Sequence, residues 1–306
     1  MKKILAGLRS RKFTQGKNNE KWQSVTAGSI GVVVRYRGDA ADAPTLTFKF
    51  TTVRVPGALN TSAEGINNAG VIVGQYQAGK GITRGFVRDG NKLTRIDHPN
   101  GSNTVCRNIN SSGVIVGNYA DSSGTIRGFL YQSGSFTDIP GPAGATSSAA
   151  NGINDNGLVV GSYSDSNGVV HGFLLKKKKY KTLDVPGATA TVASGINIKG
   201  DIVLYWAIGG GATQSSLYNG KTYKTINVPG AVESYAEDIN NAGDVVYQWF
   251  LNAFKAEGAL LHNGTYYKFD HPKSMDTYGA GINDHGIVVG FYTPLSGPGG
   301  GFKATY

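Results

Sequence analysis

Two acids and one arginine occupy the same position in a sequence repeat. Glu64, Arg107 and Glu237 each stand two residues before an Ile-Asn pair, and the other three copies carry Asn151, Ser194 and Ala280 there. Carboxylates and a guanidinium in one cavity could bind a polar ligand or carry out acid–base chemistry. A solvated wall of polar side chains would use the same residue types. The sequence therefore leaves both interpretations of this position open.

The Ile-Asn pair sets the period of the repeat. It begins at Ile66, Ile109, Ile153, Ile196, Ile239 and Ile282, at spacings of 43 or 44 residues. Between these pairs, apolar residues alternate or run in fours to sixes, and Gly, Asn, Asp and Ser clusters separate the runs. No 3.6-residue periodicity is visible. A period in the low forties built of short strands is typical of β-propeller blades.

Each repeat divides into four expected strands, which in the first copy cover residues 61–67, 71–76, 82–89 and 92–99. The last copy ends after three strands, whereas residues 48–58 resemble a fourth strand without a blade of its own. This predicts an all-β, six-bladed β-propeller with four antiparallel strands per blade, closed by an N-terminal strand that completes the last blade. Closure removes exposed sheet edges. We expect two parts, residues 1–44 and the propeller over 45–306.

A proline ends each expected fourth strand, at Pro56, Pro99, Pro140, Pro186, Pro229 and Pro272. Proline has no N–H, so we expect it in the outermost strand, where that group would face water. A small residue stands three positions before each Ile, at Ala63, Cys106, Ala150, Ala193, Ala236 and Gly279. These should lie on the crowded innermost strands, which makes the lone Cys106 a buried small apolar residue.

Blades 4 and 5 depart from the repeat. Four copies have Gly in the second strand and Phe twelve residues later, whereas blade 4 has Leu204 with Ser216 and blade 5 has Tyr247 with Ala259. In the same blades Trp206, beside Tyr205, and Trp249 replace a tyrosine. One interpretation is an aromatic platform for a sugar or another flat ligand. The other is a core that was repacked at constant volume.

The chain has 306 residues and a net charge of +10, and residues 1–44 carry nine Lys and Arg against three Asp and Glu. The first twelve residues begin like a signal peptide, but the apolar stretch is short and no cleavage site follows. They predict a basic amphipathic or disordered arm that could meet an anionic partner. No apolar run is long enough to predict a membrane-spanning helix.

No metal site, cofactor or catalytic triad is predicted. The loops at 121–124 and 164–168 carry one acid each, whereas calcium needs several oxygen ligands. The five histidines are scattered over four copies, and only His98 and His271 share a repeat position, so no Ser-His-Asp set can be nominated. An enzyme is therefore poorly supported by the residues.

The unit "GINNAGVIVGQY…GFV…IDHPNG" resembles the HAF-type extracellular repeat of bacterial proteins. The resemblance covers about residues 46–306, and blades 4 and 5 depart from its "VG" and "GF" positions. It implies export or a cell-surface setting, and it supplies no catalytic residues.

Three hypotheses follow. The leading one is a non-catalytic propeller that binds a glycan or a protein partner on the face built by the variable loops. Its candidate ligand-binding residues are Glu64, Arg107, Asn151, Tyr205, Trp206, Glu237 and Trp249. The second is a propeller hydrolase or lyase that uses channel residues such as Glu64, Arg107 and Glu237. The third is a structural subunit of a larger assembly, anchored by the basic N-terminal arm.

Overall fold

The computed structural model describes residues 13–15, 21–26, 33–37, 46–252 and 255–306. Contacts divide the chain into two units, residues 1–46 and 47–306. In the first unit, β1 (Phe13–Gln15), β2 (Lys21–Thr26) and β3 (Val33–Arg37) form an antiparallel sheet in that order. The arm predicted for residues 1–12 lies outside the described residues.

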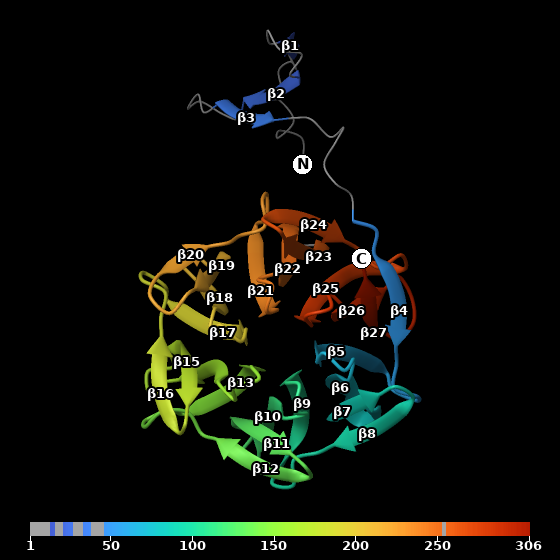
Figure 1. The fold of residues 1–306 in the computed structure, drawn as a ribbon, viewed down its shortest axis with the longest axis vertical. Helices are drawn as coiled ribbons and strands as arrows, with labels where there is room; N and C mark the ends of the chain where they lie inside the picture. Colours follow the sequence, from blue (N-terminus) through green and yellow to red (C-terminus); the bar gives the residue numbers. More distant parts are fainter. Residues whose placement is uncertain (1–12, 16–20, 27–32, 38–45, 253–254) are drawn as a thin grey trace, which may run out of the picture. The chain divides into compact units, whose positions relative to one another are not determined.

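The second unit consists of six four-stranded antiparallel sheets arranged as blades around a central axis (Figure 1). The strands of blades 1 to 3, from the axis outward, are β5 (Asn60–Ile66), β6 (Ile72–Gln77), β7 (Thr83–Asp89) and β8 (Lys92–Ile96); β9 (Gly101–Ile109), β10 (Ile115–Asp121), β11 (Ile126–Gln132) and β12 (Ser135–Ile139); and β13 (Ser147–Ile153), β14 (Val159–Ser164), β15 (Val170–Lys176) and β16 (Lys179–Leu183). A short 3-10 turn, η1 (Gly79–Gly81), lies between β6 and β7.

Blades 4 to 6 follow the same plan. Their strands are β17 (Ala190–Ile196), β18 (Ile202–Ala207), β19 (Thr213–Tyr218) and β20 (Tyr223–Thr225); β21 (Glu233–Ile239), β22 (Val245–Asn252), β23 (Lys255–His262) and β24 (Thr265–Phe269); and β25 (Ser274–Ile282), β26 (Val288–Pro294), β27 (Gly300–Thr305) and β4 (Lys49–Val53). The N-terminal strand β4 pairs antiparallel with β27 and so completes blade 6. The predicted fold and its closure are confirmed.

The prolines do not lie in the outermost strands, so that part of the prediction is wrong. Strand β4 ends at Val53, and Pro56 lies beyond it in a turn with Gly57, whose φ is +74°. The Ala58 N–H closes this turn by donating to the Val55 carbonyl at 3.2 Å. Proline followed by a residue with positive φ fits a type II turn. Pro140, Pro186 and Pro229 also lie beyond their fourth strands and are also followed by a glycine with positive φ, so in these blades the proline belongs to the connection to the next blade.

The Gly–Phe pairs face each other across neighbouring strands, as expected. Gly74 is paired with Phe86, and the same register recurs in blades 2, 3 and 6. All four phenylalanines are completely buried between blades, and each such side chain contributes about 1.5–3 kcal/mol through burial. Leu204 is paired with Ser216 and Tyr247 with Ala259. The exchange of large and small side chains in blades 4 and 5 therefore conserves the packing.

The asparagine of each Ile-Asn pair joins its blade to the next. Six side-chain amides donate to the main-chain carbonyl of the corresponding asparagine one blade further on, at 2.9–3.4 Å, and the last one closes the circle; the six are Asn67, Asn110, Asn154, Asn197, Asn240 and Asn283. Each side-chain oxygen also accepts the N–H four residues ahead. All six are buried. This asparagine ring explains why the dipeptide recurs in every blade.

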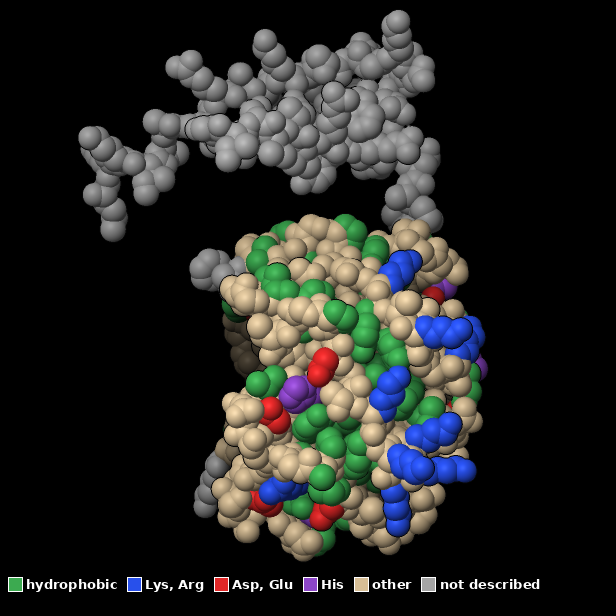
Figure 2. All heavy atoms as spheres, turned by 90° about the vertical axis from the view of Figure 1, so that its left-hand side faces the viewer, with side chains coloured by type: hydrophobic (Ala, Val, Ile, Leu, Met, Phe, Trp, Pro, Cys, Tyr) green, Lys and Arg blue, Asp and Glu red, His purple; other side chains and the backbone are tan. Residues whose placement is uncertain are grey.

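Exposed lysines are concentrated in blades 3 and 4. The space-filling view of the flank shows Lys and Arg gathered along one side, whereas Asp and Glu are scattered (Figure 2). The exposed lysines of these two blades are Lys176, Lys177, Lys178, Lys179, Lys181, Lys199, Lys221 and Lys224. Lys177 and Lys178 form the two-residue turn between β15 and β16, and both have positive φ, +47° and +65°.

Candidate functional site

A β-bulge recurs in all six innermost strands. In β5 the register with β6 shifts between Ala63 and Gly65, so Glu64 is the extra residue. The other strands shift at the same place, which makes Arg107, Asn151, Ser194, Glu237 and Ala280 the extra residues of their blades. A bulge re-aims a side chain out of the regular alternation. All six of these residues reach the central channel.

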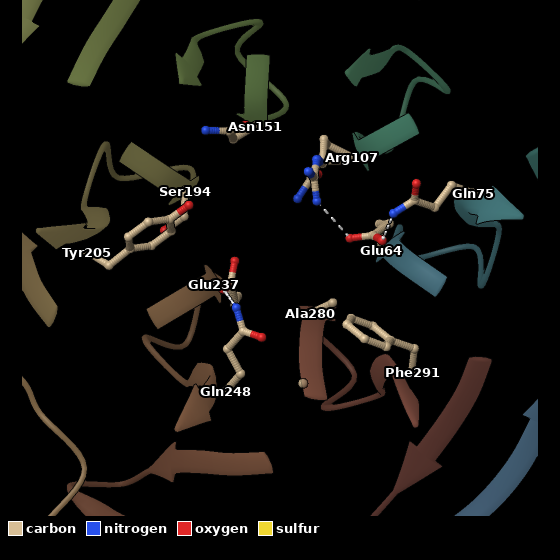
Figure 3. Close-up of a pocket in the computed structure, with 12 residues that line it drawn as sticks. Glu64, Gln75, Arg107, Asn151, Ser194, Tyr205, Glu237, Gln248, Ala280 and Phe291 are labelled. Carbon is tan, nitrogen blue, oxygen red and sulfur yellow. Dashed lines mark hydrogen bonds and ion pairs between the residues drawn. The ribbon is translucent and has the colours of Figure 1, made fainter. Parts of the chain in front are cut away.

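Two rings of side chains enclose a cavity of about 250 Å³ in the channel (Figure 3). The inner ring consists of the six bulge residues, and all of them line the cavity: Glu64, Arg107, Asn151, Ser194, Glu237 and Ala280. The outer ring comes from the second strands, eleven residues further along: Gln75, Tyr205, Gln248 and Phe291. These residues lie toward the loops that connect second to third strands. We call this space the loop-side cavity.

Glu64 is buried, and its carboxylate is fixed by three partners. It is only 7% exposed, and its carboxylate accepts hydrogen bonds from Ser62 Oγ at 2.7 Å and Gln75 Nε2 at 2.9 Å. Arg107 Nη1 lies 3.1 Å from the other carboxylate oxygen. Three partners on one carboxylate fix its orientation. Glu64 therefore also positions the guanidinium across the blade boundary.

Arg107 presents a fixed positive charge to the cavity. Its side chain remains 40% exposed, and its Nε donates to Asn118 Oδ1 at 3.4 Å. Burial lowers the pKa of Arg107, but the nearby negative charge of Glu64, together with that of Glu237, outweighs this effect and raises the pKa overall. The guanidinium therefore stays protonated and offers N–H donors in a planar array.

Glu237 is the titratable acid of the cavity. Burial raises its pKa to about 7; Glu64 adds to this rise, whereas Arg107 and the hydrogen bond from Gln248 Nε2 oppose it. The carboxyl group therefore exists in both protonation states near neutral pH. It can donate a hydrogen bond when protonated and only accept when ionised.

Aromatic side chains border the polar groups. Tyr205 packs edge-on against Tyr235, with ring centroids 5.3 Å apart, and Tyr235 packs against Phe250 at 5.8 Å. Phe291 stacks on Tyr278 at 4.5 Å. Burial raises the pKa of the Tyr205 phenol, so it stays neutral. The cavity thus combines apolar faces with directed hydrogen-bonding groups.

A hydrogen bond between opposite blades forms the floor of the cavity. Asn108 of blade 2 donates through Nδ2 to Asp238 Oδ2 of blade 5 at 3.3 Å, and Figure 1 shows β9 and β21 on opposite sides of the axis. The same Asp238 oxygen accepts the Ile282 N–H at 3.1 Å, and Oδ1 accepts that of Ile239 at 2.9 Å. Burial raises the pKa of Asp238 to about 7, against these hydrogen bonds. The pair separates the loop-side cavity from the asparagine ring.

The other four blades have glycine at the floor position. A Cβ on Gly65 would lie 2.8 Å from the Arg107 carbonyl oxygen, and one on Gly195 would lie 2.7 Å from Asp238 Cα. The corresponding glycines of blades 3 and 6 face backbone atoms just as closely. At this position only blades 2 and 5 carry a side chain, Asn108 and Asp238. The space near the axis is too small for side chains from the other four blades, which have glycine there.

Five of the seven predicted site residues meet in the loop-side cavity: Glu64, Arg107, Asn151, Tyr205 and Glu237. The two tryptophans do not. Trp249 is completely buried in the core with Tyr247 and Ala259, and Lys268 Nζ lies 4.0 Å from its ring centroid. Trp206 is half-buried, and its Nε1 donates to Ser216 Oγ at 3.0 Å. Trp249 offers a ligand no ring face, which contradicts a platform built from both tryptophans.

Sequence reasoning missed Gln75, Gln248, Phe291 and the Asn108–Asp238 pair. The first three could have been found by reading the repeat position eleven residues after each bulge residue. The pair could have been found because Asn108 and Asp238 interrupt a run of glycines at one repeat position. Cys106 is completely buried, and burial raises its thiol pKa strongly.

Within the described residues, no group of three or more His, Cys, Asp or Glu side chains could hold a metal ion. Among these residues, no helix is long and apolar enough to cross a membrane.

The fold and cavity define a six-bladed propeller with a closed-bottomed polar cavity on its loop side. The sequence matches no protein-family profile, so the HAF-type resemblance gains no support from one. No curated protein matches it either.

Several solved propellers are similar in structure. A mutant lectin from Aleuria aurantia in complex with Fucα1-6GlcNAc is 12% identical, with 83% of this chain and 93% of that chain covered and a TM-score of 0.52. AofleA from Arthrobotrys oligospora is 12% identical, with 87% and 88% covered and a TM-score of 0.55. TolB from Acinetobacter baumannii is 11% identical, with 76% and 63% covered and a TM-score of 0.53. At these identities the similarity shows the fold.

Proposed function

We propose that this protein is a glycan-binding propeller that holds a sugar residue in the loop-side cavity. The observation that carries the proposal is the convergence of Arg107, Glu64 and Glu237 with the rings of Tyr205 and Phe291 on one cavity. Sugars combine hydroxyl groups, which need directed donors and acceptors, with apolar C–H faces, which pack on aromatic rings. The cavity supplies both.

The charges of the cavity favour a neutral sugar. Glu64 and Arg107 form an ion pair and cancel each other. Glu237, with a pKa of about 7, adds a negative charge as the pH rises. No net positive charge is left to balance a carboxylate or sulfate on a ligand, so acidic sugars would be repelled.

The solved lectins of the same fold support a glycan ligand in general terms. The Aleuria aurantia protein was solved with a fucosylated disaccharide and SapL1 lectin with α-methyl fucoside. At 12% and 13% identity neither specifies the sugar bound by this chain. A cell-surface setting, where glycans are displayed, belongs to the same proposal and rests on the HAF-type resemblance.

The test is a glycan array probed with the full-length chain and two arginine variants. Arg107→Gln removes a charged donor from the cavity, and we expect binding to neutral glycans to fall roughly 10- to 100-fold. Arg84→Gln is the matched control, because Arg84 lies on β7, is ion-paired with Asp97 and does not line the cavity. Thermal melting of each variant verifies folding. Binding that Arg107→Gln leaves unchanged, or silence across the array, would reject the proposal.

A second candidate function is hydrolysis of a glycosidic bond. The specific observation is that Glu237, half-protonated near pH 7, shares a cavity with a second carboxyl group, Glu64. Glycosidases use one carboxylic acid to protonate the leaving oxygen and a carboxylate to activate water or attack the sugar. Water would add across the C–O bond, so one product gains the hydroxyl and the other the proton.

Incubating array hits with the protein discriminates between the two functions. A hydrolase would release reducing ends that mass spectrometry detects, and Glu237→Gln would abolish the release while leaving the glycan bound. A binding protein would return every glycan intact over days.

A further inference from the structure

A second cavity, of about 410 Å³, lies between blades 1 and 6. Blade 1 contributes Tyr76 and Gln77 at the end of β6, and blade 6 contributes Tyr292 and Thr293 of β26. Two further lining residues, Gln75 and Phe291, also line the loop-side cavity. Because the same side chains border both spaces, the two cavities adjoin. We call this second space the interblade groove.

The groove wall is fixed by a chain of hydrogen bonds. The Gly299 N–H donates to Asn60 Oδ1 at 2.8 Å, and Asn60 Nδ2 donates to Gln77 Oε1 at 3.0 Å. Arg54 Nη2 holds the same loop through the Pro298 carbonyl at 3.0 Å. The polar groups along the groove are therefore oriented before any ligand arrives, which lowers the entropic cost of binding.

Glycines keep the groove open on the blade 6 side. A Cβ on Gly299 would stand 3.0 Å from Asn60 Oδ1, and one on Gly300 would stand 2.9 Å from the Tyr292 ring. Side chains at these positions would displace the residues that form the wall. The connection between β26 and β27 thus leaves the space between the blades free.

The lining of the groove is aromatic and uncharged. Tyr76, Tyr292 and Phe291 provide rings, and the amides and hydroxyls of Gln75, Gln77 and Thr293 provide hydrogen-bonding groups. None of its eleven lining residues is Asp, Glu, Lys, Arg or His. This repeats the composition of the loop-side cavity without its charges.

We infer that the ligand is an oligosaccharide with one unit in the loop-side cavity and at least one more in the interblade groove. The inference rests on the proposed function and adds to it the length and path of the ligand: radially outward past Gln75 and Phe291. A single sugar would leave the groove, the larger of the two spaces, without a use.

The test compares neutral glycans of one sugar and linkage that differ only in length, from monosaccharide to tetrasaccharide. Thr293→Trp fills the groove with a bulky side chain. Ser164→Trp is the matched control, because Ser164 ends the second strand of blade 3 at the same repeat position. Gln77→Ala, which removes the acceptor of the Asn60 bond, is a milder second variant in case the tryptophan prevents folding.

We expect the wild-type protein to bind the disaccharide and longer chains about tenfold more tightly than the monosaccharide. Thr293→Trp should abolish this advantage and leave monosaccharide binding unchanged, whereas Ser164→Trp should behave as wild type. Equal affinity at every length overturns the inference and leaves the proposed function standing. Silence of the wild-type protein toward every glycan overturns both.

Discussion

The asparagine ring and the six bulge residues, here called the bulge ring, lie three residues apart in each repeat and differ in composition. The asparagine ring has the same residue in all six blades, buried and bonded to its neighbour at every step. The bulge ring has two acids, one arginine, two other polar residues and one alanine. The bulge residues lie in the innermost strands, and each asparagine directly follows the same strand. The fold therefore requires asparagine at the ring position in every blade. At the bulge position it accepts any side chain that fits.

The contrast separates the parts of the repeat that build the propeller from those that are free for binding. Replacing one of these asparagines removes both its hydrogen bond to the next blade and the hydrogen bond that holds its own turn. A change at a bulge residue alters the cavity and leaves the bulge in place, because the bulge itself is made by the backbone register. The strongest tests compare the two rings within one blade.

Asn151 and Asn154 allow that comparison with one residue type. Asn154→Ala removes three hydrogen bonds of a buried side chain: the one its amide donates to the Asn197 carbonyl, and the two its oxygen accepts from the N–H groups of Asn156 and Leu158. We expect a loss of about 2–4 kcal/mol in unfolding free energy. Asn151→Ala removes one bond, to the Ala193 carbonyl at 3.0 Å, from a half-buried position. It should cost about 1 kcal/mol or less.

Urea denaturation followed by fluorescence measures both losses, and the glycan array measures binding. The two variants should exchange roles there: Asn151→Ala should weaken binding and Asn154→Ala, where it folds, should not. Equal losses of stability would contradict the division between the rings.

The titration of Glu237 sharpens the comparison at the next level. Its pKa is about 7 in the folded protein, whereas an unperturbed glutamate, as in the unfolded chain, has a pKa of 4.5. Between these values the folded state binds more protons than the unfolded one, so ionising Glu237 destabilises the fold as the pH rises from about 4.5 through about 7. Glu237→Gln removes this contribution.

The variant should therefore gain stability relative to wild type as the pH is raised through this window, and the gain should level off above it. Urea midpoints at pH 4.5, 6 and 8 measure the difference between the two proteins, which cancels other titrating groups such as His98 and His271. Glu257→Gln controls for removing a carboxylate from the same blade. A difference that is constant with pH would show that Glu237 is not held in the cavity as described.

Most of the fold could be predicted from the sequence because the residues that the blade structure requires recur in six copies. The period, the four strands and the closure by β4 all follow from residues that recur. The bulge did not follow, because it is a shift of register that no residue type marks. The side chains that reach the channel were nevertheless predicted correctly, since their variability within an otherwise constant strand could be read.

The tryptophans show the limit of the same method. Trp206 and Trp249 depart from the repeat as visibly as Glu64 and Arg107 do, but Trp249 is buried beneath Lys268. Departure from a repeat marks either a ligand or a change in packing, and only burial separates them. The reverse case is Asp238, whose departure from glycine was overlooked although it builds the cavity floor.

The smallest effect concerns a turn that neither ring uses. Lys177 and Lys178 both adopt positive φ between β15 and β16, whereas blades 2 and 5 place Ser133-Gly134 and Asn263-Gly264 in equivalent turns. Two-residue hairpin turns with positive φ favour Asn-Gly, and a left-handed conformation strains a residue that carries a Cβ. The double substitution Lys177→Asn with Lys178→Gly should raise the unfolding free energy by about 1 kcal/mol.

The same double substitution also removes two charges from the lysine-rich flank. Glycan binding should not change, because the turn lies at the asparagine-ring end of the blade. Urea midpoints and the array measure the two quantities on the same sample, and a stability gain accompanied by lost binding would place the ligand on the lysines rather than in the cavity.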